Sequence, residues 1–150
     1  MLFRSPSFLP YSLAGHVVHG KKLGRSLGFK TLNLRFSHPR PAALGIFVVQ
    51  VHGLADEPLD GVASLGRRPT VDDSGRVLLE VHCLEWPAAL GAEGAYGKIV
   101  RVELLHKLRD EARFDSLEAL TAAIRKDADD ARAFLAAHAS QRRQTTRDRI

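Results

Sequence analysis

Hydrophobic and polar residues alternate along several short segments in the first two thirds of the chain. In the segment 77–84, the odd-numbered residues are hydrophobic and share one side of an extended chain, while Glu80 and His82 share the other side. The same alternation, or a short hydrophobic run, occurs at 14–19, 44–54, 61–65 and 99–106. Turn-forming residues separate these segments, and no helical period lies between them. The pattern predicts an antiparallel β-sheet that forms a small closed barrel or a sandwich.

A different period follows near the C-terminal end, where hydrophobic residues recur every three or four positions. The repeat consists of Leu117, Leu120, Ile124, Ala128, Ala131 and Leu135. It predicts an amphipathic helix whose hydrophobic stripe packs on the core and does not form a groove for a partner. Asp115 is the expected N-cap, because Glu118 follows three residues later as in a capping box. We therefore expect a barrel closed on one side by this helix, with a lead-in segment at 1–13, one domain at 14–138 and a basic tail at 139–150.

Composition and charge limit the function classes. The 150 residues are 45% hydrophobic and 26% charged, as in an ordinary soluble domain. Of the net charge of +5, the last eleven residues contribute +3. The remaining body is close to neutral and makes a weak surface for nucleic acid, and the tail is expected to be a solvated, frayed terminus.

Cysteine and hydrophobic content argue against a secreted or membrane protein. The single cysteine, Cys83, cannot form an internal disulfide and is expected to be a small core residue, and the seven histidines lack the spacing of a zinc site. The longest hydrophobic stretch, 42–49, is too short to span a bilayer, and Pro6 and Pro10 interrupt any signal-peptide core. We expect a cytoplasmic protein.

Two neighbouring segments carry candidate phosphate chemistry. Between residues 20 and 29, three glycines and three basic residues form a loop whose amides can approach phosphate oxygens, although a surface hairpin loop has the same composition. The loop is neither a P-loop nor a dinucleotide fingerprint. Thr31 and Asn33 follow on one side of an extended segment, and their oxygens suit Mg²⁺ that takes its other ligands from water and a nucleotide. Spacing alone favours the simpler interpretation that both satisfy local hydrogen bonds.

Glu80 is the third candidate, in the middle of a hydrophobic strand. By pattern alone it is an outward-facing surface residue. If it faces a covered cleft, it becomes a candidate general base.

Taken in order, these segments resemble the riboflavin kinase (flavokinase) family, which in bacteria usually forms the C-terminal module of a bifunctional riboflavin kinase/FAD synthetase. The matching motifs cover nearly the whole chain and lie at 15–20, 24–34, 45–47, 61–70, 79–82, 96–97, 108–111 and 114–117. The resemblance implies a mainly β fold, a six-stranded antiparallel Greek-key barrel with a C-terminal α-helix. It also implies transfer of the ATP γ-phosphoryl group to the ribityl 5′-hydroxyl of riboflavin, which gives FMN and ADP.

The resemblance also assigns roles to individual residues. Thr31 and Asn33 would hold Mg²⁺ with the nucleotide phosphates, and Glu80 would take the hydroxyl proton. The implied nucleotide-binding residues are Gly20, Lys21, Lys22, Gly24, Arg25, Gly28 and Phe29. The implied flavin-binding or flap residues are Tyr96, Arg109, Glu111 and Phe114.

The chain departs from the family pattern at two positions. Lys30 stands where the family usually has proline, and Ser64 stands where it commonly has asparagine, although some relatives have serine there. Lysine loses the fixed φ of proline and brings a cation next to the implied metal site, where it either repels Mg²⁺ or binds a phosphate oxygen. We expect Mg²⁺ and ATP to bind more weakly than in a Lys30→Pro variant.

Two alternatives remain open. One is a non-catalytic β-barrel that binds a nucleotide, a flavin or RNA, although an aromatic content of 7% makes an RNA-stacking platform a poor fit. The other is a degraded kinase fold that only stores or senses flavin. Residues 1–13 are too few to hold the FMN adenylyltransferase domain of the bifunctional enzymes. We therefore expect this chain to make FMN and not FAD, and to be joined to that domain if it is part of a longer protein.

Overall fold

The computed structural model describes residues 11–18, 30–36, 45–65, 77–91 and 94–148. They form six strands, one short 3₁₀ turn and one long helix. The strands are β1 (Tyr11–Val18), β2 (Lys30–Phe36), β3 (Gly45–His52), β4 (Leu59–Leu65), β5 (Val77–Cys83) and β6 (Ile99–Arg109). The turn η2 spans Ala88–Leu90, and the helix α1 spans Leu117–Asp148. The implied nucleotide loop at 20–29 lies outside the described residues.

The six strands close into one barrel in the order β1-β2-β5-β4-β3-β6, and every neighbouring pair is antiparallel. Strands β3, β4 and β5 follow one another as neighbours, and β2 returns to lie beside β5, which is a Greek-key arrangement. The six-stranded antiparallel Greek-key barrel with a C-terminal helix is confirmed. Strand β1 begins at Tyr11, within the segment expected to be a lead-in.

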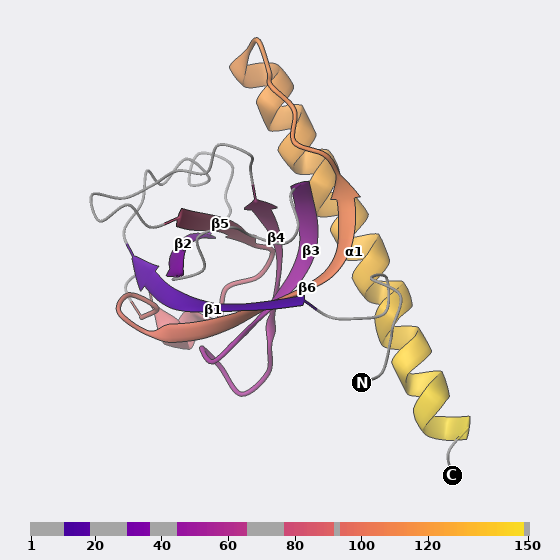
Figure 1. Ribbon diagram of the computed structural model, residues 1–150. Coiled ribbons are helices and arrows are strands. Elements are labelled where there is room, and N and C mark those ends of the chain that lie inside the picture. The colour runs from indigo at the N-terminus through magenta and orange to yellow at the C-terminus, as the bar shows by residue number, and fades with distance from the viewer. Residues whose placement is uncertain (1–10, 19–29, 37–44, 66–76, 92–93, 149–150) are drawn as a thin grey trace, which may run out of the picture.

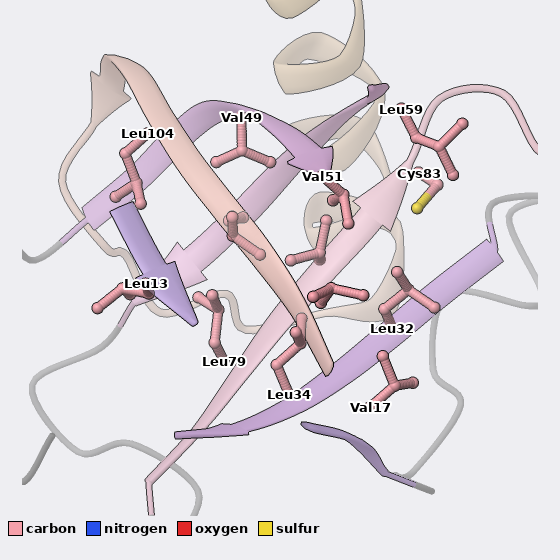
Figure 2. Packing of buried hydrophobic residues seen from close by; sticks show 14 of the residues in the cluster. Leu13, Val17, Leu32, Leu34, Val49, Val51, Leu59, Leu79, Cys83 and Leu104 are labelled. Atoms are coloured by element: carbon pink, nitrogen blue, oxygen red, sulfur yellow. The ribbon is translucent and has the colours of Figure 1, made fainter. Parts of the chain in front are cut away.

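The interior of the barrel is filled by the hydrophobic side of each alternating strand. Figure 2 shows side chains from facing strands, among them Leu32, Val51 and Leu79, directed towards a common centre. Leu79, Val81 and Cys83 on β5 are each at most 2% exposed, as the alternation in 77–84 predicts. Burial of such side chains stabilises the fold by about 1.5–3 kcal/mol each.

Helix α1 packs on the outside of the barrel, against β3, β4 and β6, and extends past it towards the C-terminal end (Figure 1). A second, smaller core forms here from Ile46, Val48, Val62, Ala131 and Leu135. The helix continues to Asp148, so most of the segment expected to be a frayed basic tail is helical. Among the described residues, no helix combines the length and the hydrophobicity needed to cross a membrane.

Two details of α1 correct the sequence-based expectations. The N-cap is Ser116 and not Asp115, because the Ser116 hydroxyl accepts the backbone N–H of Ala119 at 3.0 Å. The hydrophobic stripe is buried from Ala128 onwards, whereas Leu117 at its start is 76% exposed. The first half of the stripe therefore does not pack on the core as predicted.

Candidate active site

Strands β2 and β5 bring four polar side chains together on the outer face of the barrel. In the antiparallel register, Thr31 lies opposite His82 and Asn33 lies opposite Glu80. Residues paired in this way have Cβ atoms about 4.5–5.5 Å apart, so the four side chains form one cluster. Thr31 is 9% and Asn33 8% exposed, although both are polar. The oxygen pair and the carboxylate that the sequence singled out are therefore neighbours in space.

His82 connects the members of this cluster. Its Nδ1 atom lies 3.1 Å from the Thr31 hydroxyl oxygen, and its Nε2 atom lies 3.4 Å from Oε1 of Glu80. Burial lowers the pKa of His82 below its usual value of 6.5, and the negative charges of Glu80 and Asp127 only partly oppose this effect. The imidazole is therefore mainly neutral at pH 7.

A pocket of about 290 Å³ opens beside Glu80, between the outer face of the barrel and the first turns of α1. Its walls are largely hydrophobic and include Ile46, Val62, Leu84, Leu117, Leu120 and Ile124. A few polar side chains converge on it: Ser64, Glu80, His82, Arg109 and Asp127. Glu80 thus faces a covered cleft, which is the condition that makes it a candidate general base.

The pocket explains why the first half of the helical stripe is not part of the core. Where Ala131 and Leu135 face the barrel, they are buried in the second core. Further upstream, Leu120 and Ile124 line the pocket. The hydrophobic period thus identified the inward face of the helix correctly, but it could not tell a packed core from the wall of a cavity.

Arg109 and Asp127 form a partly buried ion pair in the wall of the pocket. The guanidinium donates from Nε and from an Nη atom to the two carboxylate oxygens of Asp127, at 2.9 and 2.8 Å. The hydrogen bond to Asp127 is the main cause of a raised pKa for Arg109. The same guanidinium lies 5.6 Å from the centre of the Phe114 ring. The pair therefore joins the end of β6 to α1 and anchors the segment 110–116 that leads into the helix.

Sequence reasoning missed Asp127, which is 5% exposed. A signal was present, because Asp127 lies three residues after Ile124 and four residues before Ala131. This spacing places an acidic residue on the hydrophobic face of the helix. An acid at such a position requires a buried partner.

The structure brings together three of the four implied flavin residues. Arg109, Glu111 and Phe114 line the pocket with Glu80. Tyr96 does not line it; its ring packs against the interior core of the barrel and lies 5.5 Å from Nζ of Lys30.

Lys30 points away from the implied metal ligands. It lies opposite the inward-facing Cys83 in the register, and its Nζ atom lies 5.3 Å from the centre of the Trp86 ring. The ammonium group thus lies on the face of β2 opposite to Thr31 and Asn33, where the aromatic rings stabilise it. Direct repulsion of Mg²⁺ by this lysine finds no support in the geometry.

The donor set around Thr31 fits Mg²⁺ chemically. A hydroxyl and an amide oxygen are hard ligands, and two such ligands suit an ion that keeps waters and binds substrate phosphates. In the described part of the chain, no three His, Cys, Asp or Glu side chains gather as a metal cage.

The family comparison agrees with this geometry. The sequence profile of the flavokinase family, described as riboflavin kinase, matches residues 7–135. A bifunctional riboflavin kinase/FMN adenylyltransferase from Escherichia coli K12 is 42% identical over 125 residues, which are 83% of this chain and 38% of the relative. The chain spans about two fifths of the length of the curated relatives that it matches first.

Two solved structures share the fold. A Streptococcus pneumoniae protein described as a macrolide-efflux protein aligns with a TM-score of 0.65 and 30% identity over 82% of this chain and 38% of that one. The riboflavin kinase from Trypanosoma brucei aligns with a TM-score of 0.57 over 90% of this chain and 82% of that one. At 24% identity, the second likeness concerns the fold alone.

Proposed function

The chain belongs to the riboflavin kinase family, and we propose that it transfers the γ-phosphoryl group of ATP to the ribityl 5′-hydroxyl of riboflavin, which gives FMN and ADP. One observation carries the proposal. Glu80 lies between a largely hydrophobic pocket and the oxygen pair of Thr31 and Asn33. A substrate whose ring system lies in the pocket would meet, at this carboxylate, a phosphate donor bound at the oxygen pair.

The pocket suits the flavin end of the substrate. Its volume of about 290 Å³ lies just below the usual range for small-molecule sites, about 300–1,000 Å³. Leu117 and Leu120 on α1 offer hydrophobic surface to a flat ring, and Arg109 and Glu111 offer polar groups at the rim. The segment 110–116, anchored through Arg109, would close over the bound ring.

The other side of Glu80 suits the phosphate donor. We propose that Thr31 and Asn33 hold Mg²⁺, which when bound neutralises charge on the phosphate oxygens. Loop residues between Gly20 and Phe29 would add backbone N–H groups to the nucleotide, as the resemblance implies.

The chemistry asks mainly for positioning and for one proton acceptor. The 5′-hydroxyl oxygen forms a bond to the γ-phosphorus, the bond from that phosphorus to the bridging oxygen breaks, and the electron pair leaves with ADP. The hydroxyl proton passes to the carboxylate of Glu80. The ring in the pocket would fix the direction from which the hydroxyl approaches.

The proposal covers the kinase reaction only. The relatives named as bifunctional carry an adenylyltransferase in a longer chain, and this chain corresponds to about two fifths of their length. We propose that the kinase unit is covalently joined to such a domain in the full-length protein.

The direct test is to incubate the purified chain with riboflavin, ATP and Mg²⁺ and to measure FMN by chromatography. We expect FMN from the wild type and from Glu103→Gln, and its near loss in Glu80→Gln. Glu103 is a matched control because it also contacts a histidine, His52, at 3.3 Å, but lies outside the pocket. Binding of riboflavin without any FMN would overturn the proposal in favour of a protein that stores or senses flavin.

A further inference from the structure

We propose that His82 is a positioning residue that orients the hydroxyl of Thr31 and the carboxylate of Glu80 at the same time. The inference rests on the proposed function. It also predicts which nitrogen of the imidazole ring carries the hydrogen, and this can be tested without measuring activity.

The ring lies between its two partners. Its Nδ1 atom is 3.1 Å from Oγ1 of Thr31, which is directly opposite across the strand pair. Its Nε2 atom is 3.4 Å from Oε1 of Glu80, two residues before it on the same face of β5. The side chain of His82 is 13% exposed, so water competes little for either nitrogen.

The chemistry of the partners determines which nitrogen carries the hydrogen. An ionised carboxylate only accepts hydrogen bonds, so the nitrogen that faces Glu80 should be Nε2–H. In a neutral ring, Nδ1 then has a lone pair and accepts the hydrogen of the Thr31 hydroxyl. The opposite tautomer would direct two lone pairs at each other between Nε2 and Glu80.

This arrangement fixes the direction of the Thr31 hydroxyl. A hydroxyl has one hydrogen and two lone pairs, and here the hydrogen points at His82. Both lone pairs of Oγ1 therefore stay available on the side away from the ring, where a cation or a donor can use them. If Nδ1 carried the hydrogen, one of these lone pairs would be lost to the ring.

The same ring restrains the carboxylate. Contact with Nε2 holds Oε1 of Glu80, which leaves the second carboxylate oxygen for the substrate proton. His82 would thus link the metal-facing and the base-facing halves of the site through its two ring nitrogens.

Two substitutions separate the two contacts. In His82→Asn the amide reaches about as far as Nδ1, so the Thr31 contact can persist while the Glu80 contact is lost. In His82→Gln the amide reaches about as far as Nε2, so the Glu80 contact can persist while Thr31 loses its acceptor.

We expect opposite kinetic signatures. His82→Asn should lower kcat about tenfold or more and leave KM for MgATP within about threefold, because the ion-pair contact of Nε2 with the carboxylate of the base is lost. His82→Gln should raise KM for MgATP about three- to tenfold and largely keep kcat, because a neutral hydrogen bond is lost at the metal-facing oxygen. Equal losses in both variants, or no loss in either, would overturn the proposal.

His52 provides the matched control. Its Nε2 atom lies 3.3 Å from Oε1 of Glu103, but neither residue lines the pocket. His52→Asn and His52→Gln should leave both kinetic constants unchanged. Thermal unfolding of all four variants identifies any kinetic loss that comes from a damaged fold.

A second measurement needs no activity. In ¹⁵N-labelled protein, the ring nitrogen chemical shifts distinguish a nitrogen that carries a hydrogen from one with a lone pair. We expect hydrogen on Nε2 of His82 and a lone pair on Nδ1. If FMN forms but Nδ1 carries the hydrogen, the positioning inference fails and the proposed function stands. If no FMN forms but the expected tautomer is present, the proposed function fails and the assignment of the ring stands.

Discussion

The two faces of the β2–β5 strand pair differ in chemistry, although both carry buried residues. On the inner face, Leu32 and Leu79 are 1% exposed and belong to the hydrophobic core of the barrel. On the outer face, Thr31 and Asn33 are 9% and 8% exposed, yet they are polar and adjoin His82 and Glu80. Burial of polar groups costs about 1–3 kcal/mol each unless hydrogen bonds replace those to water. The inner face therefore stabilises the barrel, whereas the outer face carries the polar groups of the proposed site.

The largest effect that we expect on the outer face is on activity. Glu80→Gln should lower kcat by a factor of about 10²–10⁴, because a positioned base is lost while the shape of the side chain is kept. The free energy of unfolding should change little, since the Glu80 side chain is 36% exposed. Steady-state kinetics and urea denaturation of one preparation test both statements. If Glu80→Gln loses as much stability as a variant of a core residue, the distinction between a stabilising inner face and an outer face that provides activity is wrong.

Substitution of the inner-face residue Leu79, which precedes Glu80, should lower stability and leave activity largely unchanged. Leu79→Ala should reduce the free energy of unfolding by about 2–5 kcal/mol, because it leaves a cavity in a filled barrel. At a temperature where the variant is folded, kcat should stay within a few-fold of the wild type. Urea denaturation provides the first value and the kinase assay the second. A cost below about 1 kcal/mol would mean that the interior is less tightly packed than Figure 2 indicates.

The alternation of residues was enough to predict most of the barrel. Periodicity identified five hydrophobic segments, all of which are strands, and it assigned Val81 and Glu80 to the correct faces. The number of strands and their Greek-key connections came from the resemblance, because a period of two says nothing about which strands pair. The N-cap was misplaced by one residue, since Asp115 and Ser116 are both good caps and only the observed hydrogen bond separates them.

The candidate site was harder to predict than the fold. The sequence singled out Thr31, Asn33 and Glu80 by residue type, but it did not show that they are neighbours. Thr31 and Glu80 are 49 positions apart in the sequence, and only the register of β2 against β5 brings them together. Asp127 was missed although an acid on a hydrophobic helical face was a usable signal. Tyr96 was grouped with the flavin residues by resemblance, and the structure places it away from the pocket, in contact with Lys30. The nucleotide loop stays a prediction.

Asp127 on α1 sharpens the comparison because it is a buried polar residue in the wall of the pocket whose loss should affect stability. Asp127→Asn should reduce the free energy of unfolding by about 2–4 kcal/mol, since it leaves the Arg109 charge partly buried without its ionised partner. It should also raise KM for riboflavin, because the segment 110–116 loses its anchor.

The neighbouring Asp130 provides a control of the same charge. Asp130 contacts Lys126 at 2.7 Å, but both side chains are exposed. Asp130→Asn should therefore change the free energy of unfolding by less than about 0.5 kcal/mol. Equal effects of the two substitutions in urea denaturation would mean that the Arg109–Asp127 pair is as well solvated as a surface pair.

The smallest expected effect concerns the inner face and its buried thiol. Burial raises the pKa of the Cys83 thiol from 9.0 to about 12, and the charge of Lys30 offsets this only in part. The folded protein thus keeps the thiol protonated at pH 10, whereas the unfolded chain ionises it above about pH 9, so unfolding releases a proton and stability falls as the pH rises. The difference in free energy of unfolding between the wild type and Cys83→Ala should shrink by about 1 kcal/mol between pH 8 and pH 10. If this difference in free energy of unfolding stays constant, the barrel interior tolerates a thiolate. The inner face would then accept a charge as the outer face does at Glu80, and charge would not distinguish the two faces.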